Sequence, residues 1–282
     1  IVLNMTYSKI RKFVLGLFPT FVRVRISYIK YLFWFTQKVS YWPHLINLLL
    51  SLVKKNNDTL EIRKRAFQWA LKNSDADDLE KILKKLNLGN YDPKTHTIKN
   101  NFLEDAQQLK KNSKTEMGGK GDLNLIYSIA RMSDSKYIIE TGVAYGFSSL
   151  AILLAIKDNG GGNLVSVDMP YPYRNNSDDV GIVVSKNLYD NWCLIKEPDR
   201  NGLIKAINHL NREIDLFHYD SDKSYNGRMF AYPLMYNALK MGGILISDDI
   251  QDNFAFRDFV LKKQINFTIK RFENKFIGII IK

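Results

Sequence analysis

Over much of the chain, short apolar runs alternate with longer segments that mix apolar and polar residues. From about residue 116 onward, the apolar runs are four to six residues long and the segments between them are long enough for helices. The runs that predict strands are 137–141 (YIIET), 164–168 (LVSVD), 192–196 (WCLIK), 214–219 (IDLFHY) and 243–247 (GILIS). This alternation predicts an α/β fold with a Rossmann-like, doubly wound and mostly parallel sheet.

The last eighteen residues, INFTIKRFENKFIGIIIK, follow a different pattern. They predict two strands joined by a tight turn at Glu273 and Asn274. A hairpin reverses the chain without a crossover, so we expect the last strand to run antiparallel to the parallel strands.

Residues before 116 are predicted to be helical. Two or three helices are expected between residues 5 and 55, interrupted near Pro19 and Pro43. Amphipathic helices are expected at 59–72 and 75–87, with Ser74 and Asp75 as N-caps and Gly89 as a stop for the second, and another helix is expected at 102–112. We therefore predict a helical, basic region at 1–115 and an α/β domain at 116–282.

Charge separates the first 57 residues from the others. The formal net charge is +12, and residues 1–57 contain no Asp or Glu. Their basic residues are Lys9, Arg11, Lys12, Arg23, Arg25, Lys30, Lys38, Lys54 and Lys55. Three interpretations stay open: a helical cap or packing element over the site, a peripheral contact with an anionic membrane surface, and nucleic-acid binding, which is the weakest. Apolar helices outside the sheet also allow a homodimer.

Composition adds few constraints on the compartment. Cys193 is the single cysteine, so an internal disulfide cannot form, which fits a reducing compartment. No stretch reaches the roughly 18 apolar residues that a membrane span requires. We expect a cytoplasmic protein, with a peripheral membrane contact as the alternative.

The stretch YIIETGVAYGFSSLAILLAI predicts a ligand site at the end of the first strand. Gly142 and Gly146 allow a tight turn before a helix that begins near Ser148, and ligands of open parallel sheets bind at this edge. Asp168, at the end of the second strand, is placed to accept hydrogen bonds from ribose hydroxyls. Glu140 would repel a pyrophosphate, and the glycine spacing differs from G-x-G-x-x-G. The pattern favours S-adenosylmethionine over a nicotinamide dinucleotide, so a nicotinamide-dependent oxidoreductase is the alternative that we disfavour.

Acidic residues follow the fourth and fifth predicted strands, in YDSDKSY and ISDDI. Asp220, Asp248 and Asp249 should converge at the edge that carries the glycine turn. Three carboxylates repel each other unless a cation or a proton lies between them, and Mg²⁺ prefers such oxygen ligands. Asp222 could accept the proton of an acceptor hydroxyl, and Lys223 could partly replace a metal ion. The alternative is that Asp248 and Asp249 cap the following helix.

These motifs, together with LVSVDMP, NWCLIKEPDRNGL and NFAFRDF, resemble those of the class I S-adenosylmethionine-dependent methyltransferases. The resemblance covers roughly residues 116–282 and is strongest to the subgroup that methylates hydroxyls of macrolide sugars and other small molecules. It implies a cofactor site formed by Glu140, Gly142, Ala144, Tyr145, Gly146, Ser148, Asp168, Glu197 and Asp220.

The same resemblance implies the catalytic group. In metal-dependent sugar methyltransferases of this kind, the acids matching Asp220, Asp248 and Asp249 hold magnesium, and the position of Asp222 is the proposed base. Lys223 stands where relatives often have histidine, and we place it with Asp220 and Asp222 in the catalytic group. We therefore expect a methyl transfer to a hydroxyl of a small molecule or sugar. A membrane-associated protein with a degenerate nucleotide-binding fold is the second alternative.

Overall fold

The computed structural model describes residues 33–36, 38–51, 57–211 and 214–282. The chain divides into two compact units, Ile1–Leu52 and Val53–Lys282. In the described part of the first unit, residues 33–36 are helical, and the 3₁₀ turn η1 (Val39–Tyr41) passes into α3 (Trp42–Ser51). The predicted interruption at Pro43 coincides with this transition, whereas Pro19 and the helices expected before residue 33 lie outside the described residues.

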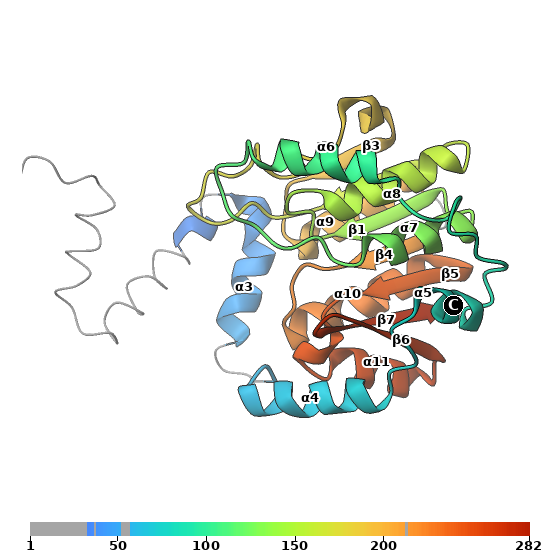
Figure 1. Ribbon diagram of the computed structural model, residues 1–282. Coiled ribbons are helices and arrows are strands. Elements are labelled where there is room, and N and C mark those ends of the chain that lie inside the picture. The colour runs from blue at the N-terminus through green and yellow to red at the C-terminus, as the bar shows by residue number, and fades with distance from the viewer. Residues whose placement is uncertain (1–32, 37, 52–56, 212–213) are drawn as a thin grey trace, which may run out of the picture. The chain divides into compact units, whose positions relative to one another are not determined.

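A mixed sheet forms the centre of the second unit (Figure 1). Its described strands are β1 (Tyr137–Thr141), β2 (Asn163–Val167), β3 (Trp192–Ile195), β4 (Ile214–Tyr219), β5 (Leu239–Ser247), β6 (Phe267–Phe272) and β7 (Lys275–Ile281). Their order is β3-β2-β1-β4-β5-β7-β6. Strands β1 to β5 pair in parallel, and β7 is antiparallel to both β5 and β6. The predicted α/β fold and its antiparallel last strand are confirmed.

Helices cover both faces of this sheet. One face packs against α5 (Leu79–Lys85), α6 (Asn100–Lys110), α7 (Leu123–Met132) and α8 (Phe147–Asp158). The other packs against α4 (Leu60–Lys72), α9 (Asp199–Leu210), α10 (Tyr225–Ala238) and α11 (Ala255–Lys263), with η2 (Lys186–Asn191) and η3 (Ile250–Asp252) in the connections. Successive strand residues face opposite layers, so Ile138 joins the first core and Ile139 the second. No helix in the described part of the chain is long and apolar enough to cross a membrane.

Helices α4 to α6 belong to the same compact unit as the sheet. Phe67 of α4 packs edge-on against Phe276 of β7, with their ring centroids 5.2 Å apart. In Figure 1, α4 runs close to the β6–β7 hairpin and α11. The region predicted as 1–115 therefore contains both the first unit and helices that share the core of the second.

The helix predicted at 75–87 begins later than expected, which corrects the assignment of its N-cap. Helix α5 starts at Leu79, and the N-cap is Asp78, whose carboxylate accepts from Lys81 N. Asp75 instead extends the sheet: its N–H donates to Ile269 O and its side chain accepts from Ile269 N, both at 2.9 Å. Pairing with β6 thus holds this residue out of the helix.

Candidate active site

The glycine turn after β1 packs closely against the backbone of neighbouring segments. Gly142 has a φ of +83°, and a Cβ added there would lie 2.0 Å from the backbone oxygen of Asp220. Gly142 N also donates to Val167 O over 2.9 Å. Gly146 has a φ of +94°, and an added Cβ would meet Gly181 Cα at 2.9 Å. Both positions need glycine for conformation and for space.

Asp168 organises this turn. Its Oδ2 accepts from Val143 N over 2.9 Å and from Ala144 N over 2.7 Å. Burial raises the pKa of Asp168 to about 6, although backbone N–H groups of Ala144, Val143 and Met169 act in the opposite direction. One carboxylate oxygen therefore fixes the turn, and the contact of Asp168 with ribose hydroxyls stays a prediction.

Glu140 lies fully inside the protein. Its Oε2 accepts from the hydroxyls of Ser149 and Ser166, the latter over 2.8 Å, and its Oε1 lies 3.5 Å from Nδ1 of His218. Burial lowers the pKa of His218, but the neighbouring carboxylate of Glu140 and other nearby acids outweigh it and raise that pKa. Glu140 thus joins β2, β4 and the first turn of α8 beneath the glycine turn, and its direct contact with a methionine group stays a prediction.

The acids after β4 and β5 converge on one lysine. Lys223 Nζ lies 2.9 Å from Asp220 Oδ1 and also pairs with Asp249 Oδ2, while Lys275 Nζ lies 3.3 Å from Asp249 Oδ1. Burial lowers the pKa of Lys223, but Asp220 and Asp249 outweigh this effect and raise it. Conversely, burial raises the pKa of Asp249, and Lys223 more than compensates and lowers it. Lys223 is therefore a cation held between two carboxylates.

Asp248 is the acid of this group that forms no ion pair with a described lysine or arginine. Its side chain is buried, and Oδ1 has no hydrogen-bond partner. Burial, followed by the charge of Asp220, raises the pKa of Asp248 to about 7. Among the described residues, no three His, Cys, Asp or Glu side chains are arranged to hold a metal ion. The predicted magnesium site does not fit this arrangement, because the ammonium of Lys223 lies against two of its three ligands.

Asp222, in the loop after β4, contacts the start of α10. Its Oδ1 accepts from Ser224 N over 3.1 Å, and a Cβ added at Gly227 would lie 2.3 Å from its Cγ. Nearby, the Ser221 hydroxyl donates to Asp199, and burial raises the pKa of Asp199 to about 7. Asp222 therefore packs on the start of α10, and its role as a base stays a prediction.

Two further predicted cofactor residues occupy the expected regions. Ser148 is buried in the first turn of α8. Glu197 follows β3 and pairs with Lys205 over 2.6 Å, and its Oε2 is buried without a hydrogen-bond partner. Both lie at the same sheet edge as the glycine turn, and a contact with the cofactor stays a prediction for each.

The connection between α6 and α7 contacts the candidate site. The sequence reasoning above did not predict this contact. Met117 N donates to the Tyr145 hydroxyl over 2.9 Å, and that hydroxyl lies 3.2 Å from Thr115 O. A Cβ added at Gly121 would lie 3.2 Å from Asp248 Oδ2. The segment thus contacts the glycine turn and the acids, and its sequence EMGGKG was the signal that could have identified it. Tyr145, predicted to bind the cofactor, anchors this segment through its hydroxyl.

Residues 139–250 match a family described as a methyltransferase domain. No curated protein matches the sequence.

Several solved structures share the fold. An O-methyltransferase from Bacillus cereus, in complex with S-adenosylhomocysteine, is 15% identical; the match covers 67% of this chain and 94% of that one, with a TM-score of 0.56. A Podospora anserina methyltransferase bound to the same ligand is 17% identical, with 79% and 97% covered and a TM-score of 0.52. A Streptomyces achromogenes O-methyltransferase involved in tomaymycin synthesis, in complex with S-adenosylmethionine, is 13% identical, with 67% and 93% covered and a TM-score of 0.50.

The comparisons support neither the oxidoreductase nor the degenerate fold. The family match includes the glycine turn, Asp168 and the acids after β4 and β5, and the fold agrees with it. Residues 139–250 therefore match a methyltransferase domain, and the second unit shares its fold with the methyltransferase structures described above.

Proposed function

We propose that this enzyme transfers a methyl group from S-adenosylmethionine to a hydroxyl group of a small molecule, with sugars as the first acceptor class to examine. The observation that carries the proposal is the group formed by Asp220, Lys223 and Asp249 beside the glycine turn. A cation that neighbouring carboxylates hold in place can stabilise the negative charge that develops on an acceptor oxygen. Two of the fold relatives described above are O-methyltransferases, which agrees with this proposal.

On the cofactor side, the chain supplies binding and orientation. Asp168 would hold the ribose hydroxyls, and Glu197 would face the adenine. Ser148 and the backbone N–H groups at the start of α8 would face the methionine end. S-adenosylmethionine, when bound, supplies an electrophilic methyl group, so the rate gained by the protein comes mainly from positioning.

On the acceptor side, the chain supplies charge and a proton acceptor. Lys223 would donate a hydrogen bond to the acceptor oxygen, and Asp220 and Asp249 would keep its ammonium in place. Asp222 would accept the hydroxyl proton through the oxygen that does not bind Ser224 N.

We assign no step to magnesium. The oxygen ligands of Asp220, Asp248 and Asp249 suit a hard divalent ion, but Lys223 already neutralises two of them. Lys223 and a divalent ion would compete for the same oxygens, which makes metal dependence a measurable property.

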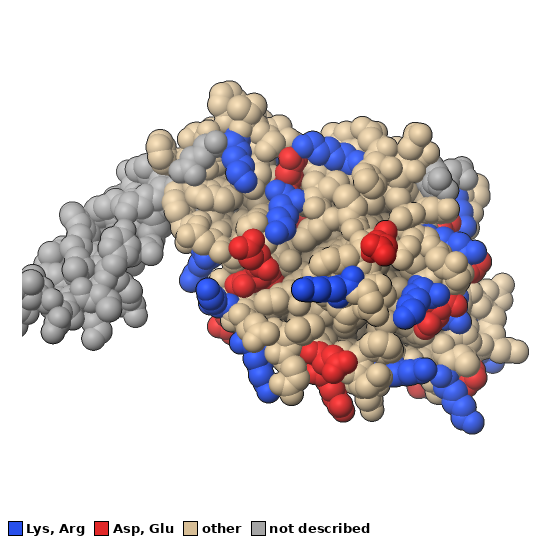
Figure 2. Space-filling view, turned by 90° about the horizontal axis from the view of Figure 1, so that it is seen from above, with Lys and Arg blue, Asp and Glu red and all other residues tan. Residues whose placement is uncertain are grey.

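For the basic region 1–57, we propose a cap over the acceptor side, with a membrane contact as the alternative. Outside this region, 32 Lys and Arg balance 29 Asp and Glu. Figure 2 shows both signs of charge interspersed on the face that it presents. The face in this view therefore carries no continuous basic patch of the kind that binds nucleic acid.

A methyl-transfer assay tests the proposal. The purified chain is incubated with S-adenosylmethionine labelled on the methyl group and with matched acceptors that carry a hydroxyl, an amine or a carboxylate on the same sugar or aromatic ring. We expect labelled product from the hydroxyl series alone. Transfer confined to the amine series would contradict O-methylation while leaving the enzyme class intact.

A further inference from the structure

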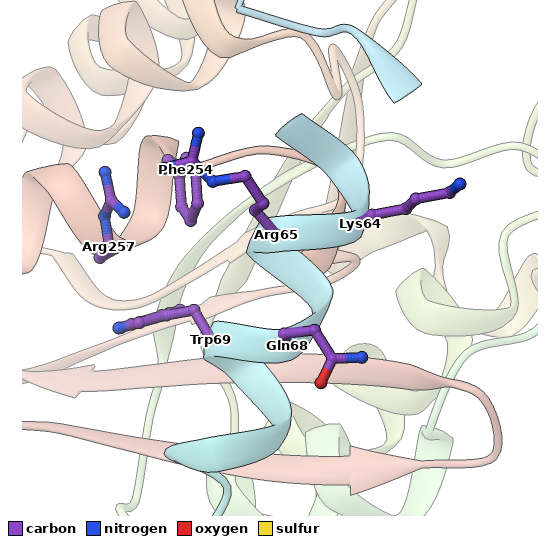
Figure 3. Close-up of a pocket in the computed structure, with 6 residues that line it drawn as sticks. All are labelled: Lys64, Arg65, Gln68, Trp69, Phe254 and Arg257. Carbon is purple, nitrogen blue, oxygen red and sulfur yellow. The ribbon is translucent and has the colours of Figure 1, made fainter. Parts of the chain in front are cut away.

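A pocket of about 400 Å³ lies between α4 and the start of α11 (Figure 3). Its lining residues are Lys64, Arg65, Gln68, Trp69, Phe254 and Arg257. None of them belongs to the cofactor or carboxylate groups described above. In Figure 3, the Trp69 side chain extends from α4 toward the side on which Phe254 and Arg257 lie. The pocket therefore combines aromatic walls with cations.

Two guanidinium groups contact the same ring. The Arg257 guanidinium carbon lies 3.5 Å from the centroid of Phe254, and that of Arg65 lies 5.8 Å from it. Stacking on a ring limits the positions that an arginine can adopt, so these charges are better fixed than those of freely solvated side chains.

Positive charge exceeds negative charge at this pocket. Nε and Nη2 of Arg257 both donate to Oδ1 of Asp258, over 2.8 and 2.7 Å, which leaves Nη1 outside this pair. In the described part of the chain, no ion pair joins Lys64 or Arg65 to an acid. Arg65 and Arg257 thus bring two guanidinium groups to the ring of Phe254, against the single carboxylate of Asp258, and this surplus of positive charge favours an anion such as a phosphate ester.

The walls of the pocket are also well anchored. Arg63, beside the pocket residues on α4, pairs with Asp252 over 2.6 Å. The ring of Trp69 packs against Phe267 of β6, with centroids 5.8 Å apart. Aromatic walls of this kind favour a planar, largely apolar group, while arginine favours phosphate oxygens.

We propose that this pocket binds a small phosphate ester attached to a planar ring. The ring lies along Trp69, and the phosphate oxygens accept hydrogen bonds from Arg65 and from the free nitrogen of Arg257. This inference does not depend on which group the enzyme methylates.

Calorimetric titration with phenyl phosphate tests the pocket. The chain is first saturated with S-adenosylhomocysteine so that the cofactor site does not contribute, and phenol and inorganic phosphate are titrated in parallel. We expect one site for phenyl phosphate, with weaker binding of both fragments. Equal affinity for inorganic phosphate would overturn the ring contact, and no binding of phenyl phosphate would overturn the site.

Two variants of one helix supply the matched comparison. Arg65 is exposed, so Arg65→Gln should fold normally, and we expect about tenfold weaker binding of phenyl phosphate. Lys72→Gln removes the same charge from the last turn of α4, outside the pocket, and should leave the affinity unchanged. Equal losses in both variants, or none in Arg65→Gln, would contradict the proposal.

Discussion

The backbone oxygen of Asp220 lies 2.0 Å from the position that a Cβ on Gly142 would occupy. The cofactor turn after β1 and the acidic loop after β4 therefore touch at a point where no side chain fits. Because Asp220 N also donates to Thr141 O over 2.9 Å, the two loops are held together on both sides of this contact. A change at Gly142 should displace both halves of the site.

Gly142→Ala should abolish S-adenosylhomocysteine binding and lower the melting temperature. Gly160 is a matched control, since its φ is also +83° but an added Cβ there meets nothing within 4 Å. Gly160→Ala should cost about 1 kcal/mol from backbone strain alone and should leave binding intact. Calorimetry and thermal melting of the two variants separate the clash from the strain, and equal effects would show that the contact with Asp220 is unimportant.

Cofactor affinity should depend on pH through Asp168. Its pKa of about 6 leaves the carboxylate mostly ionised at pH 7 and mostly protonated at pH 5. Protonation removes an acceptor for the turn N–H groups and for a ribose hydroxyl, so the affinity for S-adenosylhomocysteine should fall as pH decreases through 6. Asp168→Asn should bind weakly, with no step between pH 5 and 7. A step of the same size in this variant would assign the titration to another group.

The competition between Lys223 and a divalent ion can be measured directly. Lys223→Met removes the ammonium from Asp220 and Asp249, so the affinity for Mn²⁺ should rise about tenfold or more. Lys275→Met is the control, because Lys275 pairs with the other oxygen of Asp249 and is 46% exposed, and its effect should be smaller. Unchanged Mn²⁺ affinity in Lys223→Met would show that the lysine and the metal do not share these oxygens.

Asp222→Asn tests the proposed base. We expect the turnover rate to fall by about 10² or more while S-adenosylhomocysteine binding is retained, since the asparagine oxygen can still accept from Ser224 N. Single-turnover kinetics and calorimetry on the same preparation supply the two values. A variant that loses binding and activity together would indicate that Asp222 only holds the loop.

The sequence predicted the strand positions well, because the apolar runs that mark them are also the residues that the folded protein buries. Residues 214–219 form β4 with the predicted bounds, and every residue in that strand is buried. Asp75 shows the opposite case. Its sequence context predicts a helix N-cap, but hydrogen bonds with Ile269, almost 200 residues later, hold it in an extended conformation. No local pattern contains that contact.

The site was predictable in part for the same reason. Strand ends identify Asp168, Asp220 and Asp248 as neighbours at one edge, since all parallel strands end there. Where Lys223 points depends on side-chain packing after folding, and so does the contact of Gly121 with Asp248. Sequence spacing carries no information about either.

The most direct test of the methyltransferase assignment is a calorimetric titration of the purified chain with S-adenosylhomocysteine, with NADH as the control ligand. We expect one site of micromolar affinity for S-adenosylhomocysteine that is lost in Gly142→Ala, and no binding of NADH. Binding of NADH alone, or of neither ligand by the folded chain, would contradict the methyltransferase assignment.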